Sequence, residues 1–276
     1  MNTFFYKNRT KLKMRKLSPE EIGLFRYDIM STLTHSPDPF GSLLYTVNYE
    51  PCQELAENMS AKTGSKITPA HILNKMIAVA VAENPVFNQL VLGGCMYQME
   101  GIHITNILLL PGKKFAQSCF VLRNPHLKPL ETIQQESLAL MVERTKEAAA
   151  PRKPAASFLM RLGFKTGLYR LVSEKLAFSM GFQKGITSNI VLSNHQYGSP
   201  ANFIVLKSLI TPLKVPLLIH ATVTEKRPFV ENGTLTSKKT LILTVIPDHR
   251  IFYGIHLHQF GQSLERISSS PEKYLL

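Results

Sequence analysis

A short run near the C-terminus combines residue types that can move protons. The β-branched segment Thr240 to Ile246 leads into the triplet Asp248-His249-Arg250, and Gly254 then opens a stretch with helical spacing. An imidazole titrates near neutral pH, so a histidine fixed at the end of a strand is a candidate general base. An arbitrary histidine in such a place more often donates a hydrogen bond to a backbone carbonyl, so only the surrounding residues can favour a chemical role.

Capping signals mark the helices that must support this run. The sequence Ser18-Pro19-Glu20-Glu21 has a capping serine, a proline at the first helical position and a glutamate three residues after the cap. It predicts a helix running towards Thr34. Thr68-Pro69 begins a second helix, which Asn84-Pro85 ends.

Two further helices are predicted nearer the C-terminus. One should run from about Pro129 to Ala149, and the other follows Gly254. Helical spacing in the first of these places apolar residues inward, among them Ile133, Leu138, Met141 and Val142, and charged residues outward, among them Glu143, Arg144, Lys146 and Glu147.

β-branched residues predict strands between these helices. The segments are Leu43 to Val47, Ile102 to Leu110, Pro216 to Val223 and Thr240 to Ile246, and Glu231-Asn232-Gly233 marks a hairpin turn between the last two. Because helices and strands are interspersed along the whole chain, the pattern favours an α/β or α+β domain over an all-helical or all-β one.

The composition limits what the chain can be. With 276 residues, 44% of them hydrophobic, it is long enough to bury a substantial core as one domain. A formal net charge of +13 and a pI near 9.7 favour an acidic partner: nucleic acid, an anionic membrane surface, a phosphorylated cofactor or an acidic carrier protein. The three cysteines lie far apart with no C-x-x-C spacing, which indicates neither a disulfide framework nor a zinc site and fits a reducing compartment.

Two segments stand apart from the expected domain of residues 17–276. Residues 1–16 form a basic arm that no apolar signal-peptide core follows. At residues 151–184 an apolar and basic insertion is interpreted as a helical hairpin packed on the core, with contact to a membrane surface or an acyl chain as the alternative. Apolar stretches such as Val205 to Ile219 are interrupted by lysines and prolines, so we expect a soluble, cytoplasmic protein.

The motif around His249 and the elements beside it resemble a known family. Asp248, His249, Arg250 and Gly254 follow the pattern D-H-R-x-x-D-G, and the expected helix carries Phe260, Leu264 and the ending Pro271 to Leu276 in the register of a final E-x-P-x-x-L-L. Together they resemble the catalytic domain of the 2-oxoacid dehydrogenase dihydrolipoyl acyltransferases, in the chloramphenicol acetyltransferase-like superfamily.

Upstream segments extend this resemblance at lower identity. The stretch Val79 to Asn88 is similar to the family's A-L-x-x-x-P-x-x-N, Val191-Leu192-Ser193-Asn194 to its T-I-S-N, and Lys226 to Gly233 to the hairpin before the motif. The resemblance covers about residues 17–150 and 185–276. It implies a two-layer α/β fold, with a mixed sheet and helices packed on one face, and a homotrimer whose site lies between subunits.

The chemistry that the resemblance implies is acyl transfer from a thioester. His249 would remove the proton from an attacking thiol or hydroxyl, and the Ser193 hydroxyl would donate to the oxyanion that develops on the carbonyl, with Thr187-Ser188-Asn189 as a competing register. His249 would then meet Ser193 of a neighbouring chain. Substrate-binding positions are Asn194, Asp248, Arg250 and Gly254, the substrate is a coenzyme A or acyl-carrier thioester, and no metal is expected.

One residue departs from the family pattern. Four positions after the histidine the family has aspartate, and this chain has Tyr253. The resemblance implies that the aspartate holds the local structure through an arginine partner, whereas the histidine is oriented largely by its own backbone. Tyr253 is therefore a third candidate catalytic residue, through its hydroxyl or by closing the site with its ring. If the protein is an active enzyme with a rebuilt site, an aspartate restored there is expected to leave a gap beside His249 and to meet no arginine partner.

Two functions from different classes follow. The first is an acyltransferase, and the second is a pseudoenzyme or assembly subunit that keeps the fold and has lost catalysis through Tyr253. The sequence has no D-K-A lipoyl-lysine segment, so the acyl donor is expected to be coenzyme A, an acidic carrier protein or another subunit. Nucleic-acid binding is not expected, because no recognised motif accompanies the charge. The remaining histidines considered are predicted to be structural or on the surface: His195, His220, His256 and His258.

Overall fold

The main sheet has six strands; Ser193 lies within one of them and His249 lies just after the end of another. In the computed structural model, which describes residues 14–23, 26, 40–92, 94–109, 117–149, 188–194, 215–231 and 233–276, the spatial order is β2-β9-β8-β7-β5-β6. β7 runs parallel to β5 and β8, and the other pairs are antiparallel, so the sheet is mixed. The strands are β2 (Leu43–Asn48), β5 (His103–Leu109), β6 (Gln117–Arg123), β7 (Ile190–Asn194), β8 (Leu217–Glu231) and β9 (Thr234–Pro247).

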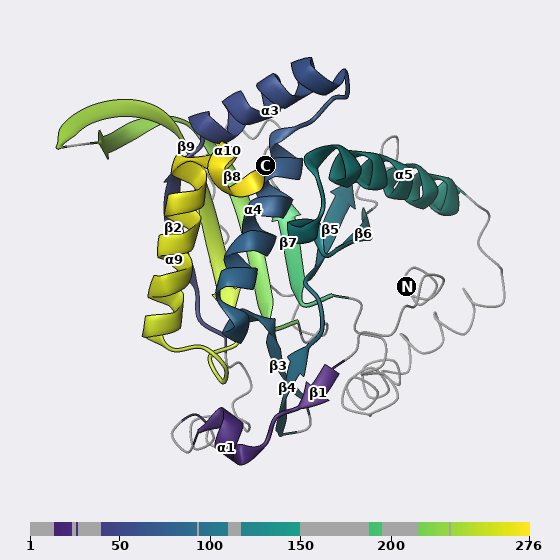
Figure 1. The fold of residues 1–276 in the computed structure, drawn as a ribbon, viewed down its shortest axis with the longest axis vertical. Helices are drawn as coiled ribbons and strands as arrows, with labels where there is room; N and C mark the ends of the chain where they lie inside the picture. Colours follow the sequence, from purple (N-terminus) through teal and green to yellow (C-terminus); the bar gives the residue numbers. More distant parts are fainter. Residues whose placement is uncertain are drawn as a thin grey trace, which may run out of the picture.

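The described helices pack on one face of this sheet (Figure 1). They are α3 (Glu50–Thr63), α4 (Pro69–Glu83), α5 (Leu130–Ala149), α9 (Gly254–Ser269) and α10 (Pro271–Leu275). Alternate residues of β7 divide between the faces: Ile190 and Leu192 belong to the main core under the helices, whereas Val191 belongs to a separate cluster on the other side. The expected two-layer α/β arrangement, a mixed sheet with helices on one face, is confirmed.

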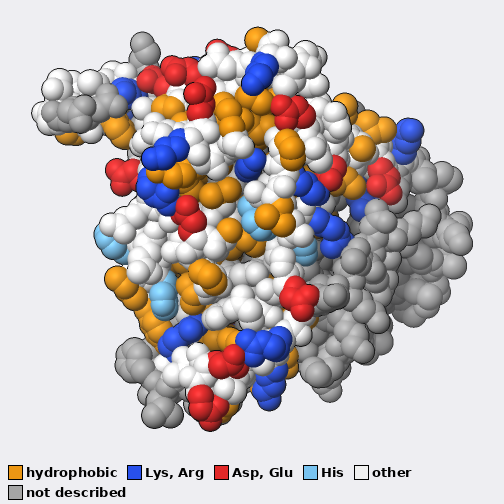
Figure 2. All heavy atoms as spheres, viewed as in Figure 1, with side chains coloured by type: hydrophobic (Ala, Val, Ile, Leu, Met, Phe, Trp, Pro, Cys, Tyr) orange, Lys and Arg blue, Asp and Glu red, His pale blue; other side chains and the backbone are white. Residues whose placement is uncertain are grey.

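Charged side chains are interspersed over the helix-covered face. Figure 2 shows lysines and arginines beside aspartates and glutamates there, with apolar side chains between them. Among the described side chains of this face, positive charge is therefore not gathered into one patch. Within the described residues, no helix combines the length and the apolarity needed to cross a membrane.

The capping signals predict the helix starts better than the ends. The Ser18 hydroxyl accepts from the Glu21 amide at 3.3 Å, and the Glu21 carboxylate accepts from the Ser18 amide at 2.9 Å, so the capping box forms. However, α1 is only Pro19–Ile22, because Gly23 adopts φ +80° and ends it. The predicted helix is therefore interrupted at Gly23; Arg26 is helical again, and the other residues from 24 to 34 lie outside the described residues. The helix α3, which begins at Glu50, was not predicted.

The inward face of α5 differs from the expectation. The positions that are buried or half-buried follow helical spacing through Leu130, Ile133, Ser137, Leu140 and Arg144. Three residues predicted to point inward are exposed instead: Leu138, Met141 and Val142. Ile133 is buried as predicted, but the buried stripe also includes a serine and an arginine, so apolar spacing alone placed the second half of the helix wrongly.

A second, smaller sheet lies below the first in Figure 1. Its order is β1-β4-β3, formed by Met14–Lys16, Cys95–Met99 and Gln89–Leu92, all antiparallel. The short helix η1 (Pro85–Asn88) connects α4 to β3, so the small sheet begins in the sequence directly after a helix of the main core. Most of the predicted arm, the insertion at 151–184, Thr187 and His195 lie outside the described residues.

Candidate functional site

His249 lies in a tight turn where β9 ends. The Ile251 and Phe252 amides both donate to the Asp248 carbonyl, at 2.9 and 3.3 Å, so the chain reverses around the histidine. The His249 side chain is exposed, and its ring lies beside the backbone of Gly41, where an added Cβ would be 3.8 Å from Cδ2. An exposed imidazole on a hydrogen-bonded turn can reach a substrate while its backbone stays fixed.

Asp248 and Arg250 brace this turn from both sides of the histidine. Asp248 is buried, its amide donates to the Pro216 carbonyl at 3.0 Å, and its carboxylate accepts from the Arg250 backbone amide at 3.0 Å. The Arg250 guanidinium also donates to this carboxylate, from Nε to Oδ1 at 2.8 Å and from Nη2 to Oδ2 at 2.5 Å. Such a bidentate, largely buried pair has a defined geometry. It supports the turn, and a substrate-binding role for either residue remains a prediction.

Tyr253 connects the turn to α9. Its amide donates to the Nδ1 atom of His256 at 3.2 Å, and the two rings are 5.4 Å apart. The preceding Phe252 is fully buried and stacks on Phe87 at 4.4 Å, which ties the turn to the core. Gly254 is the first residue of α9, and a Cβ there would meet nothing within 4 Å, so no close contact requires a glycine at this position.

An arginine that was not predicted lies beside Tyr253. The Arg26 guanidinium donates from Nη2 to the Ile251 carbonyl at 3.3 Å and to Gln89 Oε1 at 2.7 Å. Burial raises the pKa of the Tyr253 phenol, and the positive charge of Arg26 opposes that rise. The expectation that no arginine waits near position 253 is therefore wrong. No sequence motif surrounds Arg26, so only the family's aspartate–arginine pairing could have suggested searching for it.

Ser193 lies in β7, remote from His249 of the same chain. The register pairs Ser193 with His220 on β8, and His220 with Thr244 on β9, five positions before His249. Two strand spacings and at least three residues of rise separate the two Cα atoms by about 14 Å or more. Ser193 is buried on the face opposite the helices, and Asn194, half-buried, ends the strand. One chain therefore does not bring the two candidate groups into contact.

Solved structures with a similar arrangement of strands and helices include acetyltransferases. A dihydrolipoamide acetyltransferase from Azotobacter vinelandii is 15% identical, with a TM-score of 0.62 over 92% of this chain and 90% of that chain. The cubic core of a pyruvate dehydrogenase multienzyme complex is 15% identical, with a TM-score of 0.61 over 96% of this chain and 95% of that one. A chloramphenicol acetyltransferase is 14% identical, with a TM-score of 0.57 over 96% and 100%.

The chain has the chloramphenicol acetyltransferase-like fold. Its likeness is to the dihydrolipoamide acetyltransferase catalytic cores as well as to chloramphenicol acetyltransferase, as the motif around His249 predicted. No protein-family sequence profile matches the chain, and no curated protein matches it by sequence. The catalytic mechanism of the Azotobacter enzyme has been investigated through a serine, a histidine and an asparagine.

In this version of the acetyltransferase fold, buried hydrogen bonds fix the start of β7. Asn189 is fully buried; its Oδ1 accepts from the His103 amide at 2.6 Å, and its side-chain NH2 donates to Asn88 and to the Gly101 carbonyl. The Ser188 and Thr105 hydroxyls bond each other at 2.6 Å. Ser188, in the competing register, thus lies in a network that holds β7 to β5.

The histidines without a motif occupy three different settings. Burial lowers the pKa of His103 to about 4, so this imidazole is neutral at pH 7. His220, in register beside Ser193, is buried, whereas His258 is exposed on α9. Burial, with a smaller effect from Arg26, lowers the pKa of His256. Among the described residues, no group of three or more His, Cys, Asp or Glu side chains is placed to hold a metal ion.

Proposed function

We propose that this protein is an acyltransferase that moves an acyl group from a coenzyme A or carrier-protein thioester to a thiol, hydroxyl or amine acceptor. The observation that carries the proposal is the exposed imidazole of His249 on a braced turn at the end of β9, in a fold shared with two kinds of acetyltransferase. Fold alone does not assign chemistry, so the argument rests on this turn.

The proposed reaction needs one base and one hydrogen-bond donor. His249 takes the proton of the acceptor as its nucleophilic atom attacks the thioester carbonyl. The Ser193 hydroxyl donates to the oxyanion of the tetrahedral intermediate. The C–S bond then breaks, and the leaving thiolate takes the proton back from the imidazolium. Tyr253 borders the turn at its C-terminal side, where its ring can limit access of water.

The separation of His249 and Ser193 within one chain supports a site shared between chains of a homotrimer or larger assembly. A second feature supports association. Within the described part of the chain, the residues of β8 and β9 that extend beyond β2 and β7 pair only with each other and project as a two-stranded ribbon (Figure 1). Val230 and Leu235 are paired across it and are 67% and 71% exposed. A partner chain that covered this pair would remove apolar surface from water.

The donor and the compartment follow from charge and cysteines. Coenzyme A and acidic carrier proteins are both polyanionic, which suits a chain with a net charge of +13. The spacing of Cys52, Cys95 and Cys119 suits a reducing compartment, and the cytoplasm is therefore the proposed location. Residues 157–184, which lie outside the described residues, are a proposed site of peripheral membrane contact. Nucleic acid is not a proposed partner.

Tyr253 favours a second candidate, a pseudoenzyme that acts as an assembly or binding subunit. It occupies the position of the family's aspartate, and the Arg26 guanidinium beside it has no ion pair with a carboxylate of the described residues. A chain selected only for packing could keep the braced turn and lose the chemistry.

A thiol-release assay with a panel of acyl-coenzyme A and acyl-carrier thioesters separates the two candidates. The acyltransferase releases thiol in proportion to enzyme and acceptor, and His249→Ala lowers the rate of release about a hundredfold or more. Acyl transfer that is absent for every donor, in a folded and oligomeric protein, would establish the pseudoenzyme.

A further inference from the structure

Arg26 is a half-buried cation that has no carboxylate partner among the residues that the structure describes. Among the described residues, ion pairs join Arg15 to Glu21, Lys128 to Glu136, Asp248 to Arg250 and Glu83 to Arg266, and none includes Arg26. Its Nε atom is buried and has no hydrogen-bond partner. Burial lowers the pKa of the guanidinium, which nevertheless stays charged. A guanidinium buried without an ion pair to a described carboxylate needs neutral acceptors to offset the cost of its burial.

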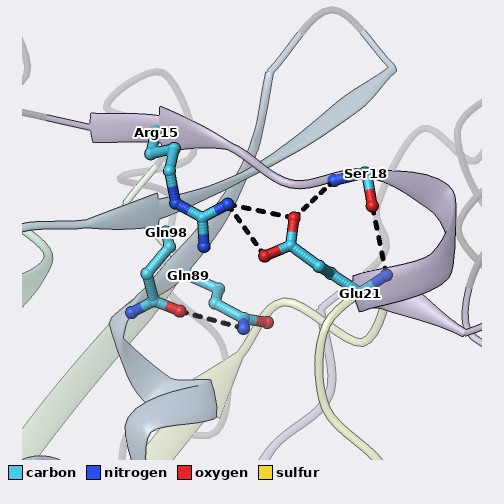
Figure 3. A network of polar contacts seen from close by, with 5 residues as sticks. All are labelled: Arg15, Ser18, Glu21, Gln89 and Gln98. Carbon is cyan, nitrogen blue, oxygen red and sulfur yellow. Dashed lines mark hydrogen bonds and ion pairs between the residues drawn. The ribbon is translucent and has the colours of Figure 1, made fainter.

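Two glutamines supply the acceptor that a carboxylate would otherwise supply. Gln89 and Gln98 are partners in the β3–β4 ladder, and Figure 3 shows their side chains side by side. Arg26 Nη2 donates to Gln89 Oε1 at 2.7 Å, Gln89 Nε2 donates to Gln98 Oε1 at 3.0 Å, and Gln98 Nε2 donates to the Asn88 carbonyl at 3.1 Å. All three bonds run in one direction, so each strengthens the next and orients both amides.

The other end of this chain of bonds is the turn that carries His249. Arg26 Nη2 also donates to the carbonyl of Ile251, two residues after the histidine, at 3.3 Å, and contacts the sulfur of Met96 at 3.5 Å. Ile251 is fully buried and bonded to Asp248, so moving its carbonyl would move the turn. The small sheet and the catalytic candidate are thus connected through one guanidinium.

We propose that Gln98, Gln89 and Arg26 form a positioning relay that fixes the turn of His249. In this chain two neutral amides of the small sheet replace the carboxylate that holds the arginine in the related family. Gln89 and Arg26 are positioning residues, since neither touches the proposed reacting atoms. The effect of the relay on the geometry of the turn does not depend on the function of the protein, whereas its effect on turnover rests on the proposed acyltransferase function.

Backbone hydrogen exchange of the full-length protein tests the relay without any substrate. In Gln89→Leu, which keeps the side-chain volume and removes the acceptor, exchange in residues 249–253 is expected to accelerate about tenfold. Gln89→Glu offers the guanidinium a carboxylate and should restore the slow exchange. The control is Arg15→Gln, which breaks the exposed ion pair with Glu21 on the same small sheet (Figure 3) and should leave exchange at 249–253 unchanged.

Kinetics of the same variants then test the consequence for catalysis. We expect kcat to fall about tenfold in Gln89→Leu with KM within about twofold of the wild type, and Gln89→Glu to recover it. Unchanged exchange at 249–253 in Gln89→Leu, with all variants folded, would overturn the relay. If the wild type transfers no acyl group, the proposed function fails, and the exchange result alone decides the relay.

Discussion

The two residues expected to act together lie in opposite settings. His249 is exposed at the end of a strand, on a turn held by a bidentate ion pair and by Arg26. Ser193 is buried within a strand whose two neighbours run parallel to it, on the face that the described helices do not cover. The base is positioned by side chains around a turn, and the hydroxyl is positioned by the ladder of the sheet.

This difference shows which changes each group can tolerate. Because His249 projects into solvent, truncating its side chain leaves the fold intact, whereas its orientation depends on a few polar contacts. The position of Ser193 depends on the backbone ladder of β7 with β5 and β8 and on the buried side-chain bonds of Ser188 and Asn189 at the start of β7. The contrast would be wrong if a given substitution near either residue disturbed the positions of His249 and Ser193 equally.

Replacing the base should have the largest effect. We expect His249→Ala to lower turnover about a hundredfold to ten-thousandfold, the range for removal of a general base. The unfolding midpoint and oligomer size should not change, because the side chain is exposed. His258→Ala, which removes another exposed histidine, is the matched control in a thiol-release assay. Turnover of His249→Ala at the wild-type rate would remove His249 from the mechanism.

Ser193→Ala should raise the barrier by roughly 2.7 to 4 kcal/mol, with little effect on donor binding. Mixing it with His249→Ala under conditions that exchange subunits sharpens the comparison. If the two groups meet between chains, random assembly rebuilds about a quarter of the sites. No recovered activity, with subunit exchange demonstrated, would contradict a shared site. Ser188→Ala tests the competing register.

Disrupting the ribbon should separate the chains. Val230→Asp combined with Leu235→Asp places two charges where we expect a partner, and so should shift the assembly to smaller species and lower activity by about tenfold or more. Analytical ultracentrifugation measures the change. Leu127→Asp, at a leucine that is 74% exposed on η2 (Pro125–Leu127), is the control and should assemble normally. A double variant that still assembles would exclude the ribbon from the interface.

Acid should loosen the Ser193 side of the molecule first. The folded protein lowers the pKa of His103 from 6.5 to about 4, so the unfolded chain binds the proton more readily, and stability falls as pH decreases from about 6.5 to 4. The expected loss is roughly 2 kcal/mol. Denaturant midpoints for wild type and His103→Gln measure it, and the variant should depend less on pH over this interval. A parallel pH dependence in both proteins would assign the effect to other groups.

Tyr253→Asp should have the smallest effect, and its sign is informative. The carboxylate would lie near Arg26, so the unfolding free energy should stay about 1 kcal/mol above that of Tyr253→Ala, which leaves the guanidinium without a new partner. Denaturant unfolding of the two variants measures this difference, and equal values would place Arg26 out of reach. In the thiol-release assay, activity only in the aspartate form would support the pseudoenzyme, and activity only with tyrosine would exclude it.

The sequence predicts most of the fold where the signals are local. Capping at Thr68, the proline after Asn84 and the hairpin at Gly233 correspond to the start of α4, the end of α4 and the β8–β9 turn. The motif around His249 predicts the strand, the turn and α9. α3 was missed because its N-cap Tyr49 makes no side-chain capping bond. Arg144 was assigned to the wrong side because a buried arginine leaves no apolar signal.

The candidate site could be predicted only in part. The resemblance selects His249 and Ser193, but their separation follows from strand order and register, which one sequence does not specify. Arg26, Gln89 and Gln98 were missed because they lie far from His249 in the sequence and become neighbours only when the small sheet docks. In the sequence, polar residues on the short strands of a small sheet show no periodicity that would distinguish a buried hydrogen-bonded relay from side chains exposed to solvent.

The pairing of β2 with β9 has a consequence for synthesis of the chain. Leu43–Asn48 find their partners at Thr240–Val245, and the bond from Arg26 to Ile251 spans 225 positions. These contacts cannot form until nearly the whole polypeptide has left the ribosome, and until then β2 lacks its partner strand and is exposed to mispairing. The turn that carries His249 is therefore among the last parts to reach its final geometry. Chains terminated before β9 would expose the unpaired β2, would tend to aggregate and would lack His249. Only completely synthesised chains would therefore be active.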